Sequence, residues 1–384
     1  MKVCILSHHF PPLQGGSEIY LGNLTDGLTK LGMDVVVITV RFDPSLPPYE
    51  EHKNLRIHRI PVPFSPIFKG YGFMLSLMPV LREIYENERF DLIHSEHPFS
   101  VLAAGKFAKE KGIPHVAVIE SLPRISIFSK LAYLTIRAFF PRSHFDVVVP
   151  WNRFISEEFL KKWGIDESKI RVIPGGIDIE KFNPFVDGSQ LRKKFADSEA
   201  QKLLFAAKPM YKTNALALAY VIKAMKEVVA NYENCKLIIG GDGRKRKDLE
   251  RLSRDLGLQE RVEFIGWVSQ GEIQEYYTAA DILVTPLAYK HGSIAVLESL
   301  ASGKPNVLWN MECLPGENGF PSSDIAMLVK PRDEEDLARG IIELLEDDAL
   351  GEKIGTNAWN FVKENFSMDK IALRYKELYE ELLE

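Results

Sequence analysis

Short apolar runs alternate along this chain with longer stretches in which apolar residues recur every three or four positions. Short runs rich in β-branched residues are typical of strands that are buried on both faces, and the longer stretches predict amphipathic helices. Together they predict an α/β fold with parallel sheets covered by helices. We expect ten buried strands, at residues 3–6, 35–40, 92–93, 116–119 and 147–149 in a first sheet and 203–206, 237–239, 262–265, 282–285 and 306–308 in a second.

The two groups of strands predict two domains. A chain of 384 residues exceeds the size at which a single core usually stops growing. Pro174-Gly175-Gly176 and Phe182-Asn183-Pro184 interrupt regular structure between the two groups, and the polar segment 187–201 follows them. We place the hinge in that segment and expect domains at 1–184 and 185–364, with a terminal helix at 365–384.

Composition and charge exclude several classes of protein. The apolar share of 46% and charged share of 26% are those of a globular protein, and a net charge of −5 offers no basic field for nucleic acid. Three scattered cysteines fit a reducing, cytoplasmic setting. We expect no signal peptide and no membrane span, so that any membrane contact would be peripheral, at the inner membrane surface.

A glycine pair follows the first predicted strand. Gly15 and Gly16 precede a helical pattern, so the backbone there can approach an anion such as a diphosphate at a helix N-terminus. A tight turn that merely needs glycine explains the pair equally well.

Two cations follow the first strand of the second group. Lys208 and Lys212 stand where they could neutralise a leaving diphosphate as a sugar–oxygen bond breaks. Two solvated loop lysines are the alternative.

One predicted helix begins near Ser293 and carries a carboxylate on an otherwise apolar stretch. Glu298 is surrounded in sequence by Val296, Leu297 and Leu300, and an unpaired buried carboxylate is costly. Its partner is either a ribose diol or a lysine or arginine in a structural salt bridge. An ionised carboxylate can accept one hydrogen bond from each hydroxyl of the diol.

In this order the motifs resemble family 4 of the glycosyltransferases over nearly the whole chain. The segments that carry the resemblance are Gly15-Gly16, Asp91-Leu92-Ile93-His94, Ile173 to Asp178, Phe182-Asn183-Pro184, Gly240-Gly241-Asp242-Gly243, Phe264 to Val268, Ala280-Asp281, and the Glu298 helix ending Ala301-Ser302-Gly303-Lys304-Pro305. The resemblance implies a GT-B fold, in which two Rossmann-like domains face each other across a cleft and a C-terminal helix crosses back to the first.

The resemblance also implies a function and a site. The chain would be a retaining, metal-independent hexosyltransferase of carbohydrate biosynthesis that moves a sugar from a nucleotide diphosphate sugar to an unidentified acceptor. Glu298 would bind ribose, and Lys208 and Lys212 the diphosphate. The remaining donor contacts would come from Gly15, Gly16, Gly266, Val268, Lys290, His291, Gly292, Ser293, Ile294 and Ala295.

Three positions depart from the family pattern. Lys290 replaces a glutamate ahead of the sugar loop, which would suit an acidic sugar. Glu120 replaces the histidine that faces the reacting sugar, so we assign Glu120 to the catalytic set with Lys208 and Lys212. Lys208 itself stands where arginine is usual.

Two other functions remain open at this point. The departures at Lys290 and Glu120 would suit a weakly catalytic, nucleotide-sugar-binding or scaffolding relative, and a nucleotide-sugar epimerase could share the fold. We expect no metal, because the scattered histidines make no convincing ligand set. Residues 63–81, rich in Phe and Met, and residues 124–142, which mix apolar and basic residues, could touch a membrane, although ordinary packing of first-domain helices is the favoured explanation.

Overall fold

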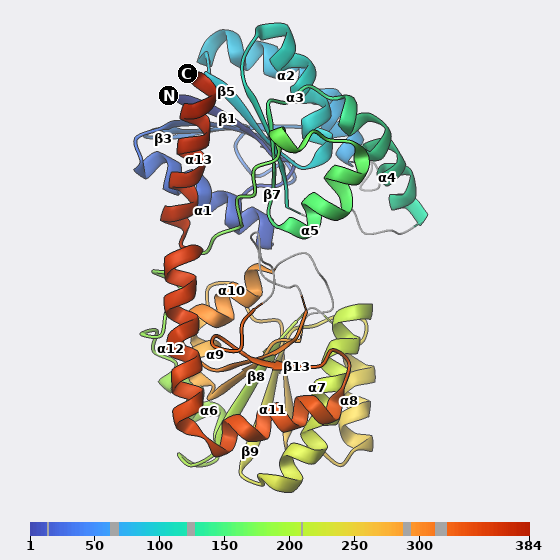
Figure 1. Ribbon diagram of the computed structural model, residues 1–384, viewed down its shortest axis with the longest axis vertical. Coiled ribbons are helices and arrows are strands. Elements are labelled where there is room, and N and C mark those ends of the chain that lie inside the picture. Colours follow the sequence, from blue (N-terminus) through green and yellow to red (C-terminus); the bar gives the residue numbers. More distant parts are fainter. Residues whose placement is uncertain (14, 62–68, 121–126, 209, 287–292, 312–320) are drawn as a thin grey trace. The chain divides into compact units, whose positions relative to one another are not determined.

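In the computed structural model the chain divides into two units, each built on its own sheet (Figure 1). The structure describes residues 1–13, 15–61, 69–120, 127–208, 210–286, 293–311 and 321–384. Among these, unit 1 comprises Met1–Gly176 and Met368–Glu384, and unit 2 comprises the residues between 177 and 367. Both units have largely parallel sheets flanked by helices, which confirms the predicted α/β fold class.

Unit 1 has a seven-stranded sheet in the order β3-β4-β2-β1-β5-β6-β7. Its strands are β1 (Lys2–Leu6), β2 (Asp34–Val40), β3 (Tyr49–His52), β4 (Leu55–Ile60), β5 (Leu92–Glu96), β6 (His115–Ile119) and β7 (Val147–Pro150). Among its described strands, only β3 pairs antiparallel, with β4. Its helices are α1 (Gly16–Lys30), α2 (Lys69–Glu88), α3 (Pro98–Lys111), α4 (Ile127–Phe139), η1 (Phe140–Arg142), α5 (Arg153–Ile155), η2 (Ser156–Leu160), η3 (Lys161–Trp163), η4 (Glu167–Lys169) and α13 (Met368–Leu383).

Helix α13 packs on α1, although nearly the whole chain separates the two in sequence (Figure 1). Gly27 of α1 makes this close approach possible, because a Cβ there would lie 2.8 Å from the Cβ of Ala372. Tyr375 and Tyr379 of α13 are buried in unit 1. The terminal helix therefore supplies part of the core of unit 1, as predicted for the C-terminal helix.

Unit 2 has a six-stranded, wholly parallel sheet in the order β10-β9-β8-β11-β12-β13. Its strands are β8 (Lys202–Ala207), β9 (Cys235–Gly240), β10 (Val262–Gly266), β11 (Ile282–Val284), β12 (Asn306–Trp309) and β13 (Met327–Val329). Its helices are α6 (Ser189–Phe195), α7 (Lys212–Asn231), α8 (Arg246–Asp255), α9 (Ile273–Ala279), α10 (Ile294–Ala301), α11 (Glu334–Glu346) and α12 (Asp348–Asn365).

All ten predicted strands form, and the described residues contain three further strands that were not predicted. Strand β4 alternates apolar residues with Arg56, His58 and Arg59, so it lacks the continuous apolar run of a central strand. Its Arg59 is buried, and its Nη1 atom lies 3.0 Å from Oε1 of Glu50 on β3. The third, β13, is only three residues long.

The chain passes between the units at residues 176/177 and 367/368, whereas the sequence placed these points at 184/185 and 364/365. The segment 187–201, which we expected to be the hinge, contains α6 and belongs to unit 2. Arg192 of α6 forms a salt bridge of 2.9 Å with Asp281 there. Phe182 is also buried in the core of unit 2, and Ile177 pairs with Ser367. Packing therefore moves the first boundary eight residues upstream.

No helix in the part of the chain that the structure describes combines the length and the apolar character needed to cross a bilayer.

Candidate functional site

In unit 2, the helices that follow the neighbouring strands β8 and β11 lie on opposite faces of the sheet. Helix α7, after β8, packs in the same core cluster as Leu204 and Ala206. Helix α10, after β11, packs in the cluster that contains Leu203 and Phe205. Connections that leave adjacent strands toward opposite faces open a crevice at their carboxyl ends, which is where ligands bind in such sheets. Lys208 directly follows β8, and the helix that carries Glu298 follows β11.

The backbone of Lys208 is held firmly at the end of β8. Its N–H group donates to the carbonyl oxygen of Gly240 at 3.0 Å. Gly241 has a φ of +122°, and a Cβ there would lie 2.0 Å from the Lys208 carbonyl oxygen, so only glycine fits. Lys208 is 6% exposed, which contradicts the reading of a solvated loop lysine. Lys212 begins α7, and its side chain lies outside the described residues.

The N-terminus of α10 carries no side-chain cap. Ser293 stands at the cap position with an extended backbone, and its side chain makes no capping hydrogen bond in the described structure. The N–H groups of the first turn, at Ile294 and Ala295, are among the donors that a helix leaves unsatisfied at this end. A phosphate or sugar oxygen could accept from them, and the helix dipole favours an anion there.

Glu298 lies one turn into α10 and is 5% exposed. Burial raises the pKa of its carboxyl to about 7, and the positive charge of Lys181 partly opposes this rise. Among the described residues, no lysine, arginine or histidine lies within 4.0 Å of Glu298 in an ion pair. The structural salt bridge that the sequence left open as an explanation is therefore not found in that part of the chain.

The remaining predicted donor contacts of unit 2 are partly described. Gly266 ends β10 with a φ of +80°, and its carbonyl oxygen accepts from the N–H group of Gly241 at 2.6 Å. Val268 follows it and packs against the core. Lys290, His291 and Gly292 lie outside the described residues.

Unit 1 has its own pocket of about 310 Å³ at the carboxyl edge of its sheet. Like β8 in unit 2, β1 lies inside the sheet, between β2 and β5. The pocket is lined by residues that follow β1, begin α1, end β5, begin α3 and follow β6: Ser7, His8, His9, Ser17, Glu96, His97, Phe99 and Glu120. Glu120, predicted from sequence, therefore lies in a pocket with a second acid, Glu96, which sequence reasoning missed.

Both acids of this pocket hold protons more tightly than usual. Burial raises the pKa of Glu96 to about 8. Burial and the nearby charge of Glu96 raise the pKa of Glu120 well above its ordinary value. Ser17 donates a hydrogen bond to Glu120 from the start of α1. Gly15 is the cap residue of that helix and Gly16 its first residue, and the carboxylate of Glu18 lies over Gly15.

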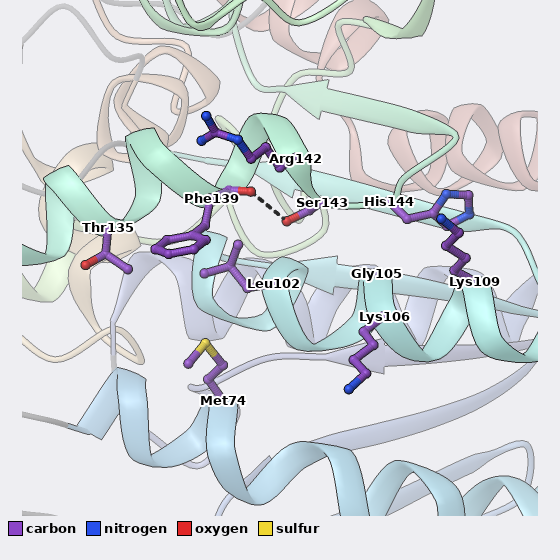
Figure 2. Close-up of a pocket in the computed structure, with 10 residues that line it drawn as sticks. All are labelled: Met74, Leu102, Gly105, Lys106, Lys109, Thr135, Phe139, Arg142, Ser143 and His144. Atoms are coloured by element: carbon purple, nitrogen blue, oxygen red, sulfur yellow. Dashed lines mark hydrogen bonds between the residues drawn. The ribbon is translucent and has the colours of Figure 1, made fainter.

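A larger pocket, of about 570 Å³, opens between α2, α3 and α4 in unit 1 (Figure 2). Figure 2 shows Met74, Leu102 and Phe139 gathered at one end and Lys109 with His144 at the other. Lys106 and Arg142 also line it. Phe139 is 57% exposed and Leu134, on the same helix, is 58% exposed. The pocket therefore combines apolar and cationic side chains at the surface.

Two Rossmann-like units, each with a largely parallel sheet flanked by helices, are the architecture of the GT-B fold. The model of glycosyltransferase family 4 matches residues 14–181, and that of the glycosyl transferases group 1 matches residues 190–361. The chain belongs to these glycosyltransferases.

Individual relatives agree with this assignment. An uncharacterized glycosyltransferase of Methanocaldococcus jannaschii is 28% identical over 100% of this chain and 99% of its own. An alpha-monoglucosyldiacylglycerol synthase of Streptococcus pneumoniae is 28% identical over 79% of this chain and 70% of its own. The crystal structure of HepE from Anabaena in complex with UDP-glucose has a TM-score of 0.75 and 16% identity, covering 99% of this chain and 100% of that one. The last likeness supports the GT-B fold.

Proposed function

We propose that this glycosyltransferase moves a sugar from a nucleotide diphosphate sugar to a hydroxyl of its acceptor, with retention of anomeric configuration and without a metal ion. The observation that carries the proposal is the site at the β8/β11 crevice of unit 2. There a buried lysine and a buried glutamate belong to two elements on opposite sides of the crevice. Membership of the family supports retention, and HepE, which has the same fold, binds UDP-glucose.

Each group has a distinct role in this proposal. Ionised Glu298 accepts hydrogen bonds from the two ribose hydroxyls, and the first turn of α10, with Lys290, His291 and Gly292 before it, holds sugar and phosphate. The backbone at Gly266 and Val268 borders the base, and the family resemblance assigns the backbone of Gly15 and Gly16 to the phosphates. As the bond from the anomeric carbon to the diphosphate oxygen breaks, Lys208 and Lys212 stabilise the charge that develops on that oxygen. The acceptor oxygen bonds to the anomeric carbon, and its proton passes to the departing diphosphate oxygen.

A donor screen in the presence of EDTA tests this function. We expect one uridine, guanosine or adenosine diphosphate sugar to raise the melting temperature of the protein, because a ligand that binds only the folded state stabilises it. The same donor should be consumed equally fast with and without EDTA, and NMR should show the anomeric configuration of the donor in the product. Activity that disappears with EDTA and returns with Mn²⁺ would contradict the metal-independent mechanism, and an inverted product would contradict retention.

We further propose that the reaction takes place in the cytoplasm, at the inner surface of the membrane. The pocket of Figure 2 supports this placement, because its apolar end could contact acyl chains while Lys106, Lys109 and Arg142 contact anionic head groups. The relative from Streptococcus pneumoniae is named for a diacylglycerol product.

Binding to vesicles tests the membrane contact. We expect the protein to sediment with vesicles that contain phosphatidylglycerol and to remain in solution with phosphatidylcholine alone, since each basic residue near an anionic surface contributes about 1 kcal/mol. The variant Lys106→Glu, Lys109→Glu should lose this sedimentation, whereas the control Lys226→Glu, Lys247→Glu in unit 2 should keep it. Equal sedimentation of both variants would argue against this pocket as the contact.

A further inference from the structure

A chain of buried hydrogen bonds leads from the C-terminal helix α13 to the pocket of unit 1. The hydroxyl of Tyr379 is bonded to Nδ1 of His94 on β5, and Nε2 of this histidine lies 2.9 Å from Oε1 of Glu96. Glu96 is hydrogen-bonded in turn to Glu120, which also accepts from the hydroxyl of Ser17. The two acids line the pocket, whereas Tyr379 and His94 are fully buried. The roles proposed for the residues of unit 2 do not account for this chain.

The imidazole of His94 can transmit the chain in either of two directions. Burial lowers its pKa to about 3, so the ring is neutral and carries a single N–H group. In the first arrangement Nδ1 accepts from Tyr379 and Nε2–H donates to Glu96. In the second, a protonated Glu96 donates to Nε2 and Nδ1–H donates to the tyrosine oxygen. The first arrangement directs the hydrogen bonds toward the pocket, and the second directs them away from it.

The hydroxyl of Tyr379 favours the first arrangement. Among the described residues, its one hydrogen bond is the bond to His94. If the tyrosine oxygen accepted from Nδ1–H, its own O–H group would be left without an acceptor at a fully buried position. An unsatisfied buried donor is costly and rare in native proteins. Tyr379 should therefore donate to Nδ1, which places the single N–H group of His94 on Nε2.

The two acids carry this direction into the pocket. Burial raises the pKa of Glu96 to about 8, and burial together with the charge of Glu96 raises the pKa of Glu120 well above its ordinary value. Near pH 7 both carboxyls are therefore mostly protonated. Because Glu96 accepts from Nε2–H of His94, its own proton is free to donate to Glu120. Glu120, which also accepts from Ser17, then keeps its proton for the pocket.

The surroundings of the two acids contain little positive charge. Within the described residues, neither acid is paired with a lysine or an arginine, and burial lowers the pKa of the neighbouring His97 to about 4. The hydrogen bonds from His94 and Glu120 are therefore the main contacts that stabilise Glu96 when it ionises. The other titratable or polar groups that face the pair are His8, His9, Ser17, Glu18 and Tyr20 from the β1 loop and α1, and Tyr375 and Tyr379 from α13.

We propose that the chain from Tyr379 to Glu96 turns the proton of Glu120 toward the pocket, where Glu120 serves as a hydrogen-bond donor in the transfer reaction. Tyr379, His94 and Glu96 are thus positioning residues. When Glu96 ionises at higher pH, Glu120 donates back to Glu96 and the pocket loses this donor. The inference rests on the proposed transfer reaction, for which the family resemblance placed Glu120 in the catalytic set. It also gives α13 a part in the chemistry of unit 1.

The tautomer of His94 tests the direction of the chain without any substrate. We expect ¹⁵N NMR of the full-length protein at pH 7 to show a protonated Nε2 and an unprotonated Nδ1, with the signals of His94 assigned by their absence from His94→Gln. The opposite tautomer in the wild type would overturn the proposal. Because the measurement requires no donor, its outcome is independent of whether the protein transfers a sugar.

The pH dependence of kcat at saturating donor tests the role of the Glu120 proton. In the wild type kcat should fall about tenfold or more between pH 7 and pH 9.5, because the pocket loses a preorganised donor as Glu96 ionises with a pKa of about 8. In Glu96→Gln the amide accepts from His94 and donates to Glu120 but cannot ionise, so kcat should no longer fall over this interval. A flat wild-type profile, or the same fall in a folded Glu96→Gln variant, would contradict the proposal.

Two tyrosine variants separate positioning from packing, and they also serve if Glu96→Gln does not fold. Tyr379→Phe removes the hydrogen bond to Nδ1, so Nε2–H becomes a weaker donor to ionised Glu96 and the pKa of Glu96 should rise. The midpoint of the fall in kcat should therefore move up by about half a pH unit, which is the size of effect expected from one neutral hydrogen bond. Tyr375→Phe removes an equally buried hydroxyl of α13 whose partner is Tyr20, and it should keep the wild-type midpoint.

Lost packing has a different signature in these variants. It would lower the melting temperature of either tyrosine variant without moving the midpoint of kcat. The same midpoint in folded Tyr379→Phe and in the wild type would remove Tyr379 from the chain and overturn the proposal.

Discussion

The double variant Lys208→Ala, Lys212→Ala should lose at least a hundredfold in kcat. Loss of one preorganised electrostatic contact costs other enzymes about a hundredfold or more, and here two positive charges are removed beside the leaving diphosphate. Because their attraction for the diphosphate grows as the bond breaks, kcat and kcat/KM should fall together. Steady-state kinetics with the donor found in the screen measures both constants.

Two further variants separate chemistry from stability. Lys208 is buried, so its loss could disturb packing as well as charge. Lys208→Arg keeps the charge and should keep most of the turnover, while the exposed pair Lys226→Ala, Lys247→Ala should leave both constants unchanged. The melting temperature identifies any variant that is not folded. A folded double variant with near-normal kcat would remove both lysines from catalysis.

The variant Glu298→Gln should weaken donor binding by about 10- to 150-fold at pH 8. That range corresponds to about 1.5–3 kcal/mol, which is typical of a hydrogen bond to a charged group. Calorimetric titration with the nucleoside diphosphate and with the whole donor measures the loss. Glu346→Gln, an exposed change at the end of α11, is the matched control. Lys304 is unsuitable as a control, because it is half-buried.

The same carboxyl predicts a pH dependence with a definite sign. Its pKa is raised to about 7 by burial, so the ionised form that accepts from ribose becomes more populated as pH rises from 6 to 8. Donor affinity of the wild type should therefore increase over this interval and level off above it. Glu298→Gln should show a flat profile near the low-pH affinity of the wild type. An unchanged dissociation constant at pH 8 would place the ribose elsewhere.

Several parts of the fold could be predicted from local pattern alone. A buried parallel strand must present apolar residues on both faces. The runs at Val35 to Val40 and Leu203 to Ala206 can therefore be recognised as strands from their own sequence. Strand β4 was not predicted, because its Arg59 becomes buried only when β3 brings Glu50 beside it. The domain boundary was misplaced for a similar reason, since the polar composition of α6 conceals its salt bridge to Asp281.

For the candidate site, the sequence by itself determined which residues stand at strand ends and helix starts, because glycines, lysines and the Ser293 boundary are marked by short-range patterns. It thereby predicted Lys208 and Glu298, whereas Glu120 was predicted from the family resemblance. Only the tertiary structure decided that Glu96 belongs with Glu120. His94, on the same strand as Glu96, is held by Tyr379, which lies 285 residues away in sequence, and Glu120 follows the neighbouring strand β6. The protonation of such a group depends on what surrounds it in space, and that is fixed only when α13 packs on unit 1.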